Sequence, residues 1–482
     1  MSETVGRRPL ALLASACVVL RLPALLMSRF YDPDEAAIAV QARTIVAGGR
    51  LYVDMADRKP PIPPFVYAWW FQVTSSNDIR GPRLFVALLL ALAAVALTLE
   101  VARTHGRTAG LWAGSLYVLG AYAFGPADAG AANYAHFALP LATIALLCCR
   151  RAGWRYSLAG GLMLGLAILS RQSWIFAVPA AALSCWFAAK AKGVATHAIG
   201  LAAGIGLAAL FAPWSEYWFW NFKSSPGFVF ASVDVGWVVS RGLAAVGIFV
   251  AFHLALVVAA GSTLPASLRR EPDLWLWALT GLAATSAGFR FYGHYWLQLL
   301  PPLVLLAAPV LAAASVRRQR LAQASLAVGA VVALVLLFVP HAFRDRPDPA
   351  PLAATIRQCT AVDQRVFVWG SFPELSVLVD RPAAGRLVHM DFVTGRSGGR
   401  SGGSDAVTPG ARTKMMDDLR ADPPTVLVDT SGVSNLGYQA FPMLGQPELG
   451  DFARAGYTPQ AVAGGFVLWW INGHVPCAAA TP

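Results

Sequence analysis

Residues 84–99, LFVALLLALAAVALTL, contain no charged side chain. A helix needs about 20 apolar residues to cross the roughly 30 Å hydrocarbon core of a bilayer, and this run supplies most of them. Residues 321–339, LAQASLAVGAVVALVLLFV, form a second run of the same kind. Of the 482 residues, 56% are hydrophobic and only 13% are charged, against about 25% charged in soluble domains. The sequence therefore predicts a polytopic α-helical membrane protein.

The net charge of +12 is unevenly distributed along the chain. Residues 340–482 contain 12 Lys and Arg against 13 Asp and Glu, so the positive excess lies in residues 1–339. No nucleic-acid partner is expected, because the excess belongs to the membrane part. The basic residues recur in short clusters between apolar runs, at positions 7–8, 103–107, 150–155, 190–192, 269–270 and 317–320.

These clusters predict the orientation of the chain. Lys and Arg concentrate in the cytoplasmic loops of membrane proteins, so all six clusters are placed on the cytoplasmic side of the cytoplasmic membrane. The N-terminus is then inside, and residues 340–482 form an external segment. The arrangement predicts about eleven transmembrane helices, at 10–27, 82–101, 109–125, 134–149, 157–170, 173–189, 194–213, 236–259, 273–289, 295–314 and 321–339.

The external segment has the pattern of a small α/β domain. The runs at 365–370 and 425–429 are short, rich in Val and end in turns, as buried strands do. Residues 351–358 and 413–420 have helical composition. The chain is therefore expected to divide into a transmembrane domain, 1–339, and a C-terminal external α/β domain, 340–482.

The cysteines divide in the same way. Cys359 and Cys477 lie in the external segment, where disulfides persist. A bridge between them is expected if their Cα atoms come within about 7 Å. The other four fall in apolar runs: Cys17, Cys148, Cys149 and Cys185. There Cys behaves as a small hydrophobe, and no Cys/His spacing indicates a zinc site.

The first external loop, residues 28–81, carries the densest signal. Tyr31-Asp32-Pro33-Asp34-Glu35 opens a helical stretch that ends at the Gly pair 48–49. Asp before a helix-starting Pro, with Glu three residues later, is a capping pattern, so Asp32 is expected to be the cap and Glu35 its partner. Asp34 is the acid that the cap does not need, which makes it the candidate for chemistry.

Further along this loop stands Asp57-Arg58-Lys59, followed by the Pro-rich run 60–64. Two cations followed by stiff, extended chain could hold an anionic headgroup near the interface, because prolines lower the entropy lost on fixing them. The alternative is ordinary snorkelling, in which Lys and Arg reach out of the bilayer edge to water.

Three more external residues point to anion binding. Arg290 and His294 lie in the aromatic segment 288–302, where an interfacial belt explains the aromatic residues but not the Arg and the imidazole. Arg with a neighbouring imidazole suits phosphate oxygens. Arg171, between the fifth and sixth spans, is a further external cation.

Four features together resemble the GT-C superfamily of membrane glycosyltransferases. They are an Asp-Glu pair after the first span, a Lys-Pro-Pro element in the same loop, a His-Tyr pair that continues into Leu-Leu-Pro-Pro, and an external α/β tail. The likeness is greatest to bacterial relatives of dolichyl-phosphate-mannose protein mannosyltransferases and of lipid A aminoarabinose transferases. It covers the layout of the whole chain, although only the three short motifs are specific.

The resemblance implies an inverting enzyme that uses a polyprenyl-phosphate-linked sugar. It implies that Asp34 acts at the acceptor and that Lys59 binds the donor phosphate. Arg290, His294 and Tyr295 match the later donor-side motif. The chain departs from the family at 132–136, Ala-Asn-Tyr-Ala-His, where relatives often carry a Glu at the position of Ala135. Asp128, a few residues earlier, could substitute for that acid, or could be an ordinary turn residue.

The expected function is therefore transfer of a sugar from a polyprenyl-phosphate-linked donor to a lipid, glycan or protein acceptor at the outer face of the cytoplasmic membrane. The catalytic candidates are Asp34, Glu35 and Asp128. The candidates for binding the donor phosphate are Arg58, Lys59, Arg171, Arg290, His294 and Tyr295. No cofactor is expected, because the donor is already activated; clustered carboxylates could take a divalent metal, but no spacing demands one.

Two other classes of protein remain open on the sequence. A transporter or flippase of a lipid-linked saccharide would usually show internal repeats and ionisable residues near the bilayer midplane, whereas here those residues gather at one outer surface. A noncatalytic envelope assembly protein would use the external domain to bind partners. Release of polyprenyl phosphate from a lipid-linked sugar separates the enzyme from both.

Overall fold

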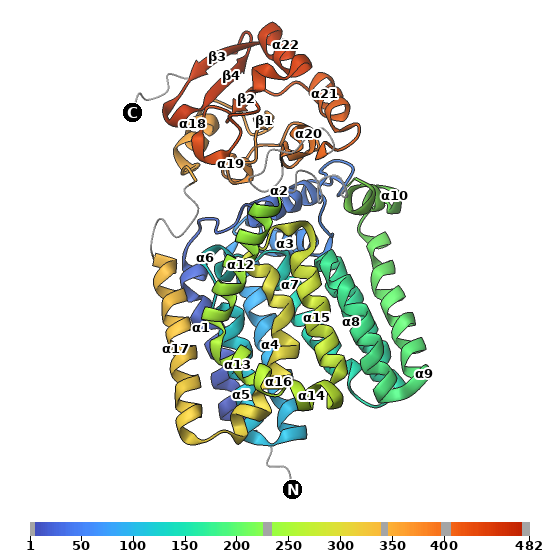
Figure 1. Ribbon diagram of the computed structural model, residues 1–482. Coiled ribbons are helices and arrows are strands. Elements are labelled where there is room, and N and C mark those ends of the chain that lie inside the picture. The colour runs from blue at the N-terminus through green and yellow to red at the C-terminus, as the bar shows by residue number, and fades with distance from the viewer. Residues whose placement is uncertain (1–4, 225–233, 339–345, 397–405, 475–482) are drawn as a thin grey trace.

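The computed structural model describes residues 5–224, 234–338, 346–396 and 406–474. A bundle of roughly parallel helices carries a smaller α/β unit at one end (Figure 1). The long bundle helices are α1 (Arg7–Leu26), α4 (Arg80–His105), α5 (Arg107–Tyr122), α7 (Tyr134–Cys149), α8 (Trp154–Ser170), α9 (Val178–Gly206), α12 (Val235–Phe252), α13 (Leu254–Ser262), α15 (Pro272–Ser286), α16 (Leu300–Ala313) and α17 (Val316–Phe338). The short elements beside them are α6 (Pro126–Gly130), α10 (Trp214–Trp218), α14 (Leu264–Arg270), η1 (Gln172–Ala177), η2 (Leu207–Leu210), η3 (Phe219–Lys223), η4 (Ala287–Phe289) and η5 (Gly293–Leu299).

Each of the eleven predicted spans coincides with helical chain. Two of them, 173–189 and 194–213, fall on the two halves of α9, which is broken where Ala189 and Lys190 leave helical geometry and Lys190 takes φ +54°. By length and composition, six helices in the described ranges are able to cross a membrane. The polytopic helical fold is thus confirmed, and the count of eleven crossings stays a prediction.

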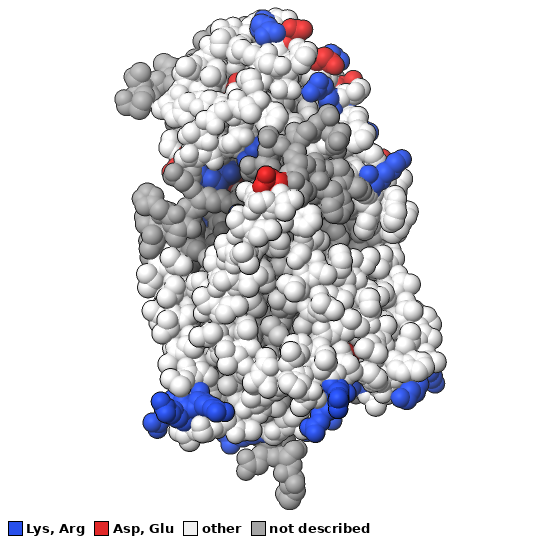
Figure 2. Space-filling view, in the orientation of Figure 1, with Lys and Arg blue, Asp and Glu red and all other residues white. Residues whose placement is uncertain are grey.

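The basic clusters gather at the end of the bundle remote from the α/β unit, where Figure 2 shows a band of Lys and Arg. The loops that carry them are the alternate connections of the bundle, as their spacing in the sequence predicts. The α/β unit and the basic clusters therefore lie at opposite ends of the bundle.

The first loop folds into two helices between the bundle and the α/β unit, α2 (Pro33–Val46) and α3 (Ile62–Thr74). The predicted cap is confirmed, because the Asp32 carboxylate accepts a hydrogen bond of 3.0 Å from the backbone N–H of Asp34. The extended Pro-rich chain expected after Lys59 is not found. Pro63 and Pro64 instead occupy the first turn of α3, where the missing N–H of proline costs nothing.

The C-terminal unit is a four-stranded mixed sheet with helices around it. Its strand order is β1-β2-β4-β3, with β1 and β2 parallel and β4 antiparallel to both β2 and β3. The strands are β1 (Val366–Trp369), β2 (Val426–Asp429), β3 (Tyr457–Ala461) and β4 (Val467–Ile471). The helical segments are α18 (Ala350–Gln358), α19 (Pro373–Val379), α20 (Asp391–Thr394), α21 (Ala411–Ala421), α22 (Pro447–Gly456), η8 (Ser434–Leu436), η9 (Met443–Gly445) and η10 (Ala463–Gly465). Both predicted strands and both predicted helices are present, because short apolar runs and amphipathic runs are local signals.

The α/β unit is docked on the first loop by polar contacts. The backbone N–H of Ala56 donates to the carbonyl of Arg386 at 2.6 Å. From α2, Arg43 donates to the carbonyl of Val377 at 3.0 Å and pairs with Asp380 at 2.8 Å. These contacts leave a cavity between the unit and the bundle. Cys359 is disulfide-bonded; its expected partner, Cys477, lies outside the described residues.

Candidate active site

The predicted residues converge on a cavity of about 630 Å³ where the α/β unit faces the end of the bundle. Acidic and basic side chains are visible at this level of the molecule in Figure 2. The cavity lining comes from the first loop, the start of α12, the segment before α16, and the α/β unit. Four separate parts of the chain therefore build one site.

Asp34 and Lys59 form an ion pair on the bundle side of this cavity. The cap at Asp32 fixes the first turn of α2 and so places the Asp34 carboxylate at the N-terminal end of the helix. Each side chain of the pair is 31% exposed, which leaves both reachable from the cavity. Burial alone would lower the pKa of Lys59, but attraction to Asp34 and Asp57 outweighs it and the pKa is raised. Lys59 therefore stays protonated throughout the neutral range.

Asp57 and Arg58 are held rigidly beside this pair. The Asp57 carboxylate accepts hydrogen bonds from Gln41 at 3.0 Å and from the hydroxyl of Tyr134 at 3.3 Å. The Arg58 guanidinium lies 4.2 Å from the ring centre of Phe392 in the α/β unit. Burial lowers the pKa of Arg58 to about 10, so it remains a cation at neutral pH.

The segment before α16 contributes Arg290, His294 and Tyr295. Two non-glycine residues that flank Arg290 take positive φ, Phe289 at +54° and Phe291 at +49°. Such a conformation costs about 1–3 kcal/mol per residue and is retained where a function or tight packing demands it. Here it accompanies an Arg290 that lines the cavity although the residue is only 6% exposed.

The wall provided by the α/β unit is also charged. Asp391 pairs with Arg396 at 3.4 Å, and Arg346 pairs with Glu374 at 2.8 Å. His389 stacks on Phe392, with 4.7 Å between ring centres. Burial lowers the pKa of His389, although Asp391 and Asp57 oppose the shift. His389 is therefore neutral at pH 7.

The charges of the cavity wall favour an anionic ligand. Six cations line it: Arg58, Lys59, Arg241, Arg290, Arg346 and Arg396. Four carboxylates face them: Asp32, Asp34, Asp57 and Asp391. A partly dehydrated cavity strengthens such charge interactions relative to water. The site is therefore suited to a ligand that carries phosphate.

Comparison with solved structures identifies the fold. ArnT from Cupriavidus metallidurans, bound to undecaprenyl phosphate, superimposes with a TM-score of 0.66 at 14% identity, over 98% of this chain and 99% of that one. The apo state of the same protein gives 0.64 at 15% identity, over 95% of this chain and 97% of that one. The chain has the fold of the GT-C membrane glycosyltransferases. The oligosaccharyltransferase of Archaeoglobus fulgidus in its apo form gives 0.55 at 12% identity, over 97% of this chain and 75% of that one. No family model and no curated sequence matches the chain.

Within this GT-C fold, six of the nine predicted site residues line the cavity: Asp34, Arg58, Lys59, Arg290, His294 and Tyr295. Glu35 does not. It is fully buried and pairs with Arg83 at 2.6 Å, while its other oxygen accepts from the backbone N–H of Ala132 at 2.9 Å. Its carboxylate also accepts from the backbone N–H of Tyr31 at 3.4 Å. Glu35 therefore ties α2 to α4 and to the chain just before α7, away from the cavity. This packing favours a structural role, and the catalytic role expected of Glu35 stays a prediction.

Asp128 and Arg171 lie behind residues of the cavity wall. The Asp128 carboxylate accepts from the backbone N–H of His294 at 2.9 Å and lies 2.7 Å from its Nδ1. Arg171 stacks on the ring of Tyr295, 4.0 Å from its centre. Neither Asp128 nor Arg171 is among the described residues that line the cavity. They orient His294 and Tyr295, so neither is placed to touch a ligand directly.

Several lining residues were missed by the sequence analysis. Arg241 was detectable, because a charged residue inside a predicted span is a functional signal. Asp32 was read only as a cap, yet it also lines the cavity. Arg346, His389 and Asp391 carried no sequence signal, because charged residues of a solvated domain are ordinary until packing places them against the bundle.

One set of donor atoms within the cavity is compact enough for a cation. The ligand atoms of Asp32, Asp34 and His294 lie within 4.8 Å of one another. Carboxylate oxygens and imidazole suit a divalent metal. The same three residues also serve as a helix cap, a partner of Lys59 and a partner of Asp128.

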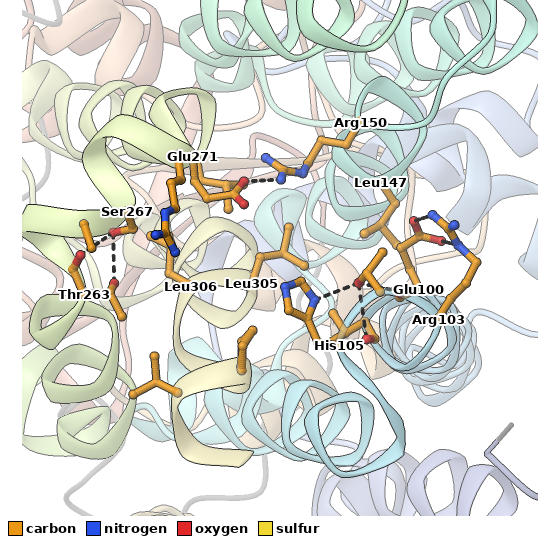
Figure 3. Close-up of a pocket in the computed structure, with 17 residues that line it drawn as sticks. Glu100, Arg103, His105, Leu147, Arg150, Thr263, Ser267, Glu271, Leu305 and Leu306 are labelled. Atoms are coloured by element: carbon orange, nitrogen blue, oxygen red, sulfur yellow. Dashed lines mark hydrogen bonds and ion pairs between the residues drawn. The ribbon is translucent and has the colours of Figure 1, made fainter. Parts of the chain in front are cut away.

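A second cavity, of about 340 Å³, opens at the basic end of the bundle. Figure 3 shows Arg150 pointing to Glu271 and Glu100 pointing to Arg103. Leu305 and Leu306 also line this cavity. Glu100 and Arg103 are 2.6 Å apart. Because its carboxylates already pair with arginines and none of the nine predicted residues lines it, this cavity is not the candidate active site.

Proposed function

We propose that this chain is an inverting glycosyltransferase that takes a sugar from a polyprenyl-phosphate-linked donor. The observation that carries the proposal is the cavity itself. It holds a carboxylate, Asp34, next to Lys59 and further cations at the end of a GT-C bundle. Solved structures of the same fold include ArnT with undecaprenyl phosphate and AglB, from Archaeoglobus fulgidus, with an inhibitory peptide and dolichol-phosphate.

The cations that line the bundle side of the cavity are assigned to bind the donor phosphate. Lys59 and Arg290 line the cavity and belong to the bundle part of the chain, from which a lipid chain in the bilayer would deliver its phosphate. As the glycosidic C–O bond breaks, negative charge develops on the departing phosphate oxygen, and fixed cations in a dehydrated site stabilise it. Arg58 adds a third cation, whose guanidinium lies on the ring of Phe392 and donates to the Thr408 hydroxyl at 2.7 Å.

Asp34 is assigned as the base. An acceptor hydroxyl or amine attacks the anomeric carbon from the face opposite to the phosphate, the new bond to carbon forms as the bond to phosphate oxygen breaks, and the proton of the acceptor passes to Asp34. In the resting protein Asp34 is paired with Lys59. A donor phosphate would compete for Lys59 and leave the carboxylate available as proton acceptor.

The reaction needs no nucleotide and no cofactor, because the donor is already activated. The acceptor is proposed to enter from the α/β unit, whose residues His389, Asp391 and Arg396 form the other wall. The basic clusters at the far end support a cavity at the outer face of the cytoplasmic membrane. The sugar and the acceptor are to be found by assay.

The experiment is a transfer assay on the purified full chain with a panel of polyprenyl-phosphate sugars, in which free polyprenyl phosphate is measured. Asp34→Asn should lower the single-turnover rate by about 10² to 10⁴ while donor binding persists, because a lost general base has an effect of this size. Lys59→Ala should instead weaken donor binding, because it removes a charge-assisted contact.

Asp54→Asn is the matched control, because Asp54 is an exposed acid of the same loop that pairs with Arg50 and does not line the cavity. If no donor in the panel releases polyprenyl phosphate, the glycosyltransferase proposal is rejected. If a donor is used but Asp34→Asn transfers at the parental rate, only the assignment of the base fails. Dialysis against EDTA before the assay tests whether a divalent metal at Asp32, Asp34 and His294 is needed.

A further inference from the structure

Far from the cavity, three metal-ligating side chains meet inside the bundle. Cys149 is the last residue of α7, Cys185 lies four residues before the break in α9, and His197 lies seven residues after Lys190 in the second half of that helix. Their ligand atoms lie within 4.8 Å of one another. All three are buried, Cys149 and Cys185 completely and His197 to within 2%. The proposed transfer reaction uses none of them.

The separation of Cys149 from His197 matches a tetrahedral metal site. Cys149 Sγ and His197 Nδ1 are 3.5 Å apart. Zinc bonds of about 2.3 Å to sulfur and about 2.0 Å to nitrogen, at the tetrahedral angle, place the two ligand atoms about 3.5 Å apart. The Ser157 hydroxyl of α8 lies next to the Cys185 thiol. It is completely buried and makes no hydrogen bond of normal geometry to any residue the structure describes. It is thus available as a fourth, oxygen ligand.

Glycines bring the three helices to this distance. A Cβ on Gly160 would lie 2.5 Å from Cys149 Sγ, and one on Gly161 would lie 2.1 Å from the carbonyl of His197. Small residues allow the close approach of membrane helices. The convergence is therefore produced by backbone packing, and the thiols and imidazole have little room to turn away from one another.

The charges of the three side chains favour a divalent cation. Two thiolates and a neutral imidazole around a divalent cation have no net charge, so the complex can be buried without a counter-ion. Soft sulfur ligands with imidazole in tetrahedral geometry favour Zn²⁺ over Mg²⁺ or Ca²⁺. We propose that Cys149, Cys185 and His197, with Ser157 as the fourth ligand, bind one Zn²⁺ ion.

The metal would have a structural task. Cys185 and His197 lie on either side of the helix break at Ala189 and Lys190, and Cys149 belongs to a different helix. A bound ion fastens the two halves of α9 to each other and to α7. The site lies next to the basic end of the bundle, since Arg150 follows Cys149 directly. On the proposed orientation this is the reducing, cytoplasmic side, where clustered cysteines bind metal more often than they form disulfides.

The test is the zinc content of the full chain, purified in detergent without chelator and measured by elemental analysis. About one zinc per chain is expected, the occupancy of a single structural site. Cys149→Ser, Cys185→Ser and His197→Gln should each reduce the zinc content severalfold. Cys148→Ser and Cys17→Ser are the matched controls, because they alter membrane cysteines outside the cluster. They should retain the ion.

Replacement of zinc by Co²⁺ gives a second measurement that does not depend on the variants folding. The parental protein should show the near-ultraviolet charge-transfer band of thiolate bound to cobalt. The proposal is overturned if the parental chain holds no zinc and shows no such band, or if every variant retains zinc equally. A Cys149–Cys185 disulfide in protein alkylated under nonreducing conditions would also overturn it.

Discussion

Glu35 and Asp34 are adjacent acids to which the structure gives different tasks, and Glu35→Gln tests that separation. Glu35 contacts the Arg83 guanidinium at 2.8 Å and 2.6 Å, and both side chains are at most 2% exposed. The substitution keeps the shape of the side chain but removes its charge. Arg83 is then a buried cation without a counter-charge, so Glu35→Gln should destabilise the fold rather than the chemistry.

The magnitude follows from what Arg83 retains. Removing one member of a buried ion pair costs about 3–5 kcal/mol. Arg83 still donates to three carbonyls, those of Ala24, Met27 and Arg29, at 2.6–2.7 Å. The Gln amide oxygen can still accept from the N–H of Ala132. Glu35→Gln is therefore expected to lower the free energy of unfolding by about 3 kcal/mol, the lower end of this range.

The assay is unfolding of the purified protein by SDS in mixed micelles, followed by tryptophan fluorescence, together with transfer activity per folded molecule. Asp54→Asn, which breaks an exposed pair with Arg50, is the control and should change the free energy of unfolding by less than about 1 kcal/mol. The double variant Glu35→Gln/Arg83→Met should recover part of the loss, because the uncompensated charge is gone.

One result would contradict a structural role for Glu35. If Glu35→Gln unfolds like the parent while its transfer rate per folded molecule falls by about 10² or more, Glu35 takes part in the reaction as the base does. The structural role assigned to the Arg83 pair would then be wrong.

Three further predictions follow from the site and the fold. Asp128→Ala should lower the rate of transfer by about 10- to 100-fold, the usual effect of losing a partner that orients a functional His. Asp128→Asn keeps an acceptor for the His294 N–H and should have a milder effect. Transfer at the parental rate in both variants would show that Asp128 has no role in the site. A Cys introduced at the exposed Asp451 of α22 should react with an impermeant thiol reagent in intact cells, and one at the exposed Ser315 between α16 and α17 only after lysis; the reverse pattern would invert the proposed orientation. Because burial holds the pKa of His389 below its ordinary value of about 6.5, the unfolded chain takes up a proton first as pH falls. The stability due to neutral His389 is therefore present above about pH 6.5 and lost below it, a loss that His389→Gln should reduce in unfolding experiments across that range.

The sequence alone was sufficient for features that local chemistry determines. Charge-free runs such as 84–99 have few ways to satisfy their backbone except as helices in a bilayer, so the membrane class and the helix positions could be predicted. The Val-rich strands and the Asp32 cap are equally local signals. Asp34 was identifiable as the acid that the cap does not need. The roles expected of Lys59, Arg290 and His294 came from the resemblance of their motifs to the GT-C superfamily.

Only the tertiary structure decided which of these residues act together. The capping pattern separates Glu35 from Asp34 in the sequence, but only the packing against Arg83 shows that Glu35 turns inward while Asp34 lines the cavity. The contribution of the α/β unit to the cavity wall could not be predicted either. Its residues follow Lys59 by about 300 positions in the chain, and only tertiary packing brings them to the cavity. Likewise, Cys149, Cys185 and His197 have no metal-ligand spacing in sequence. Their convergence depends on glycine contacts between helices, and such long-range approach is set by the packing of the whole bundle rather than by any local run of residues.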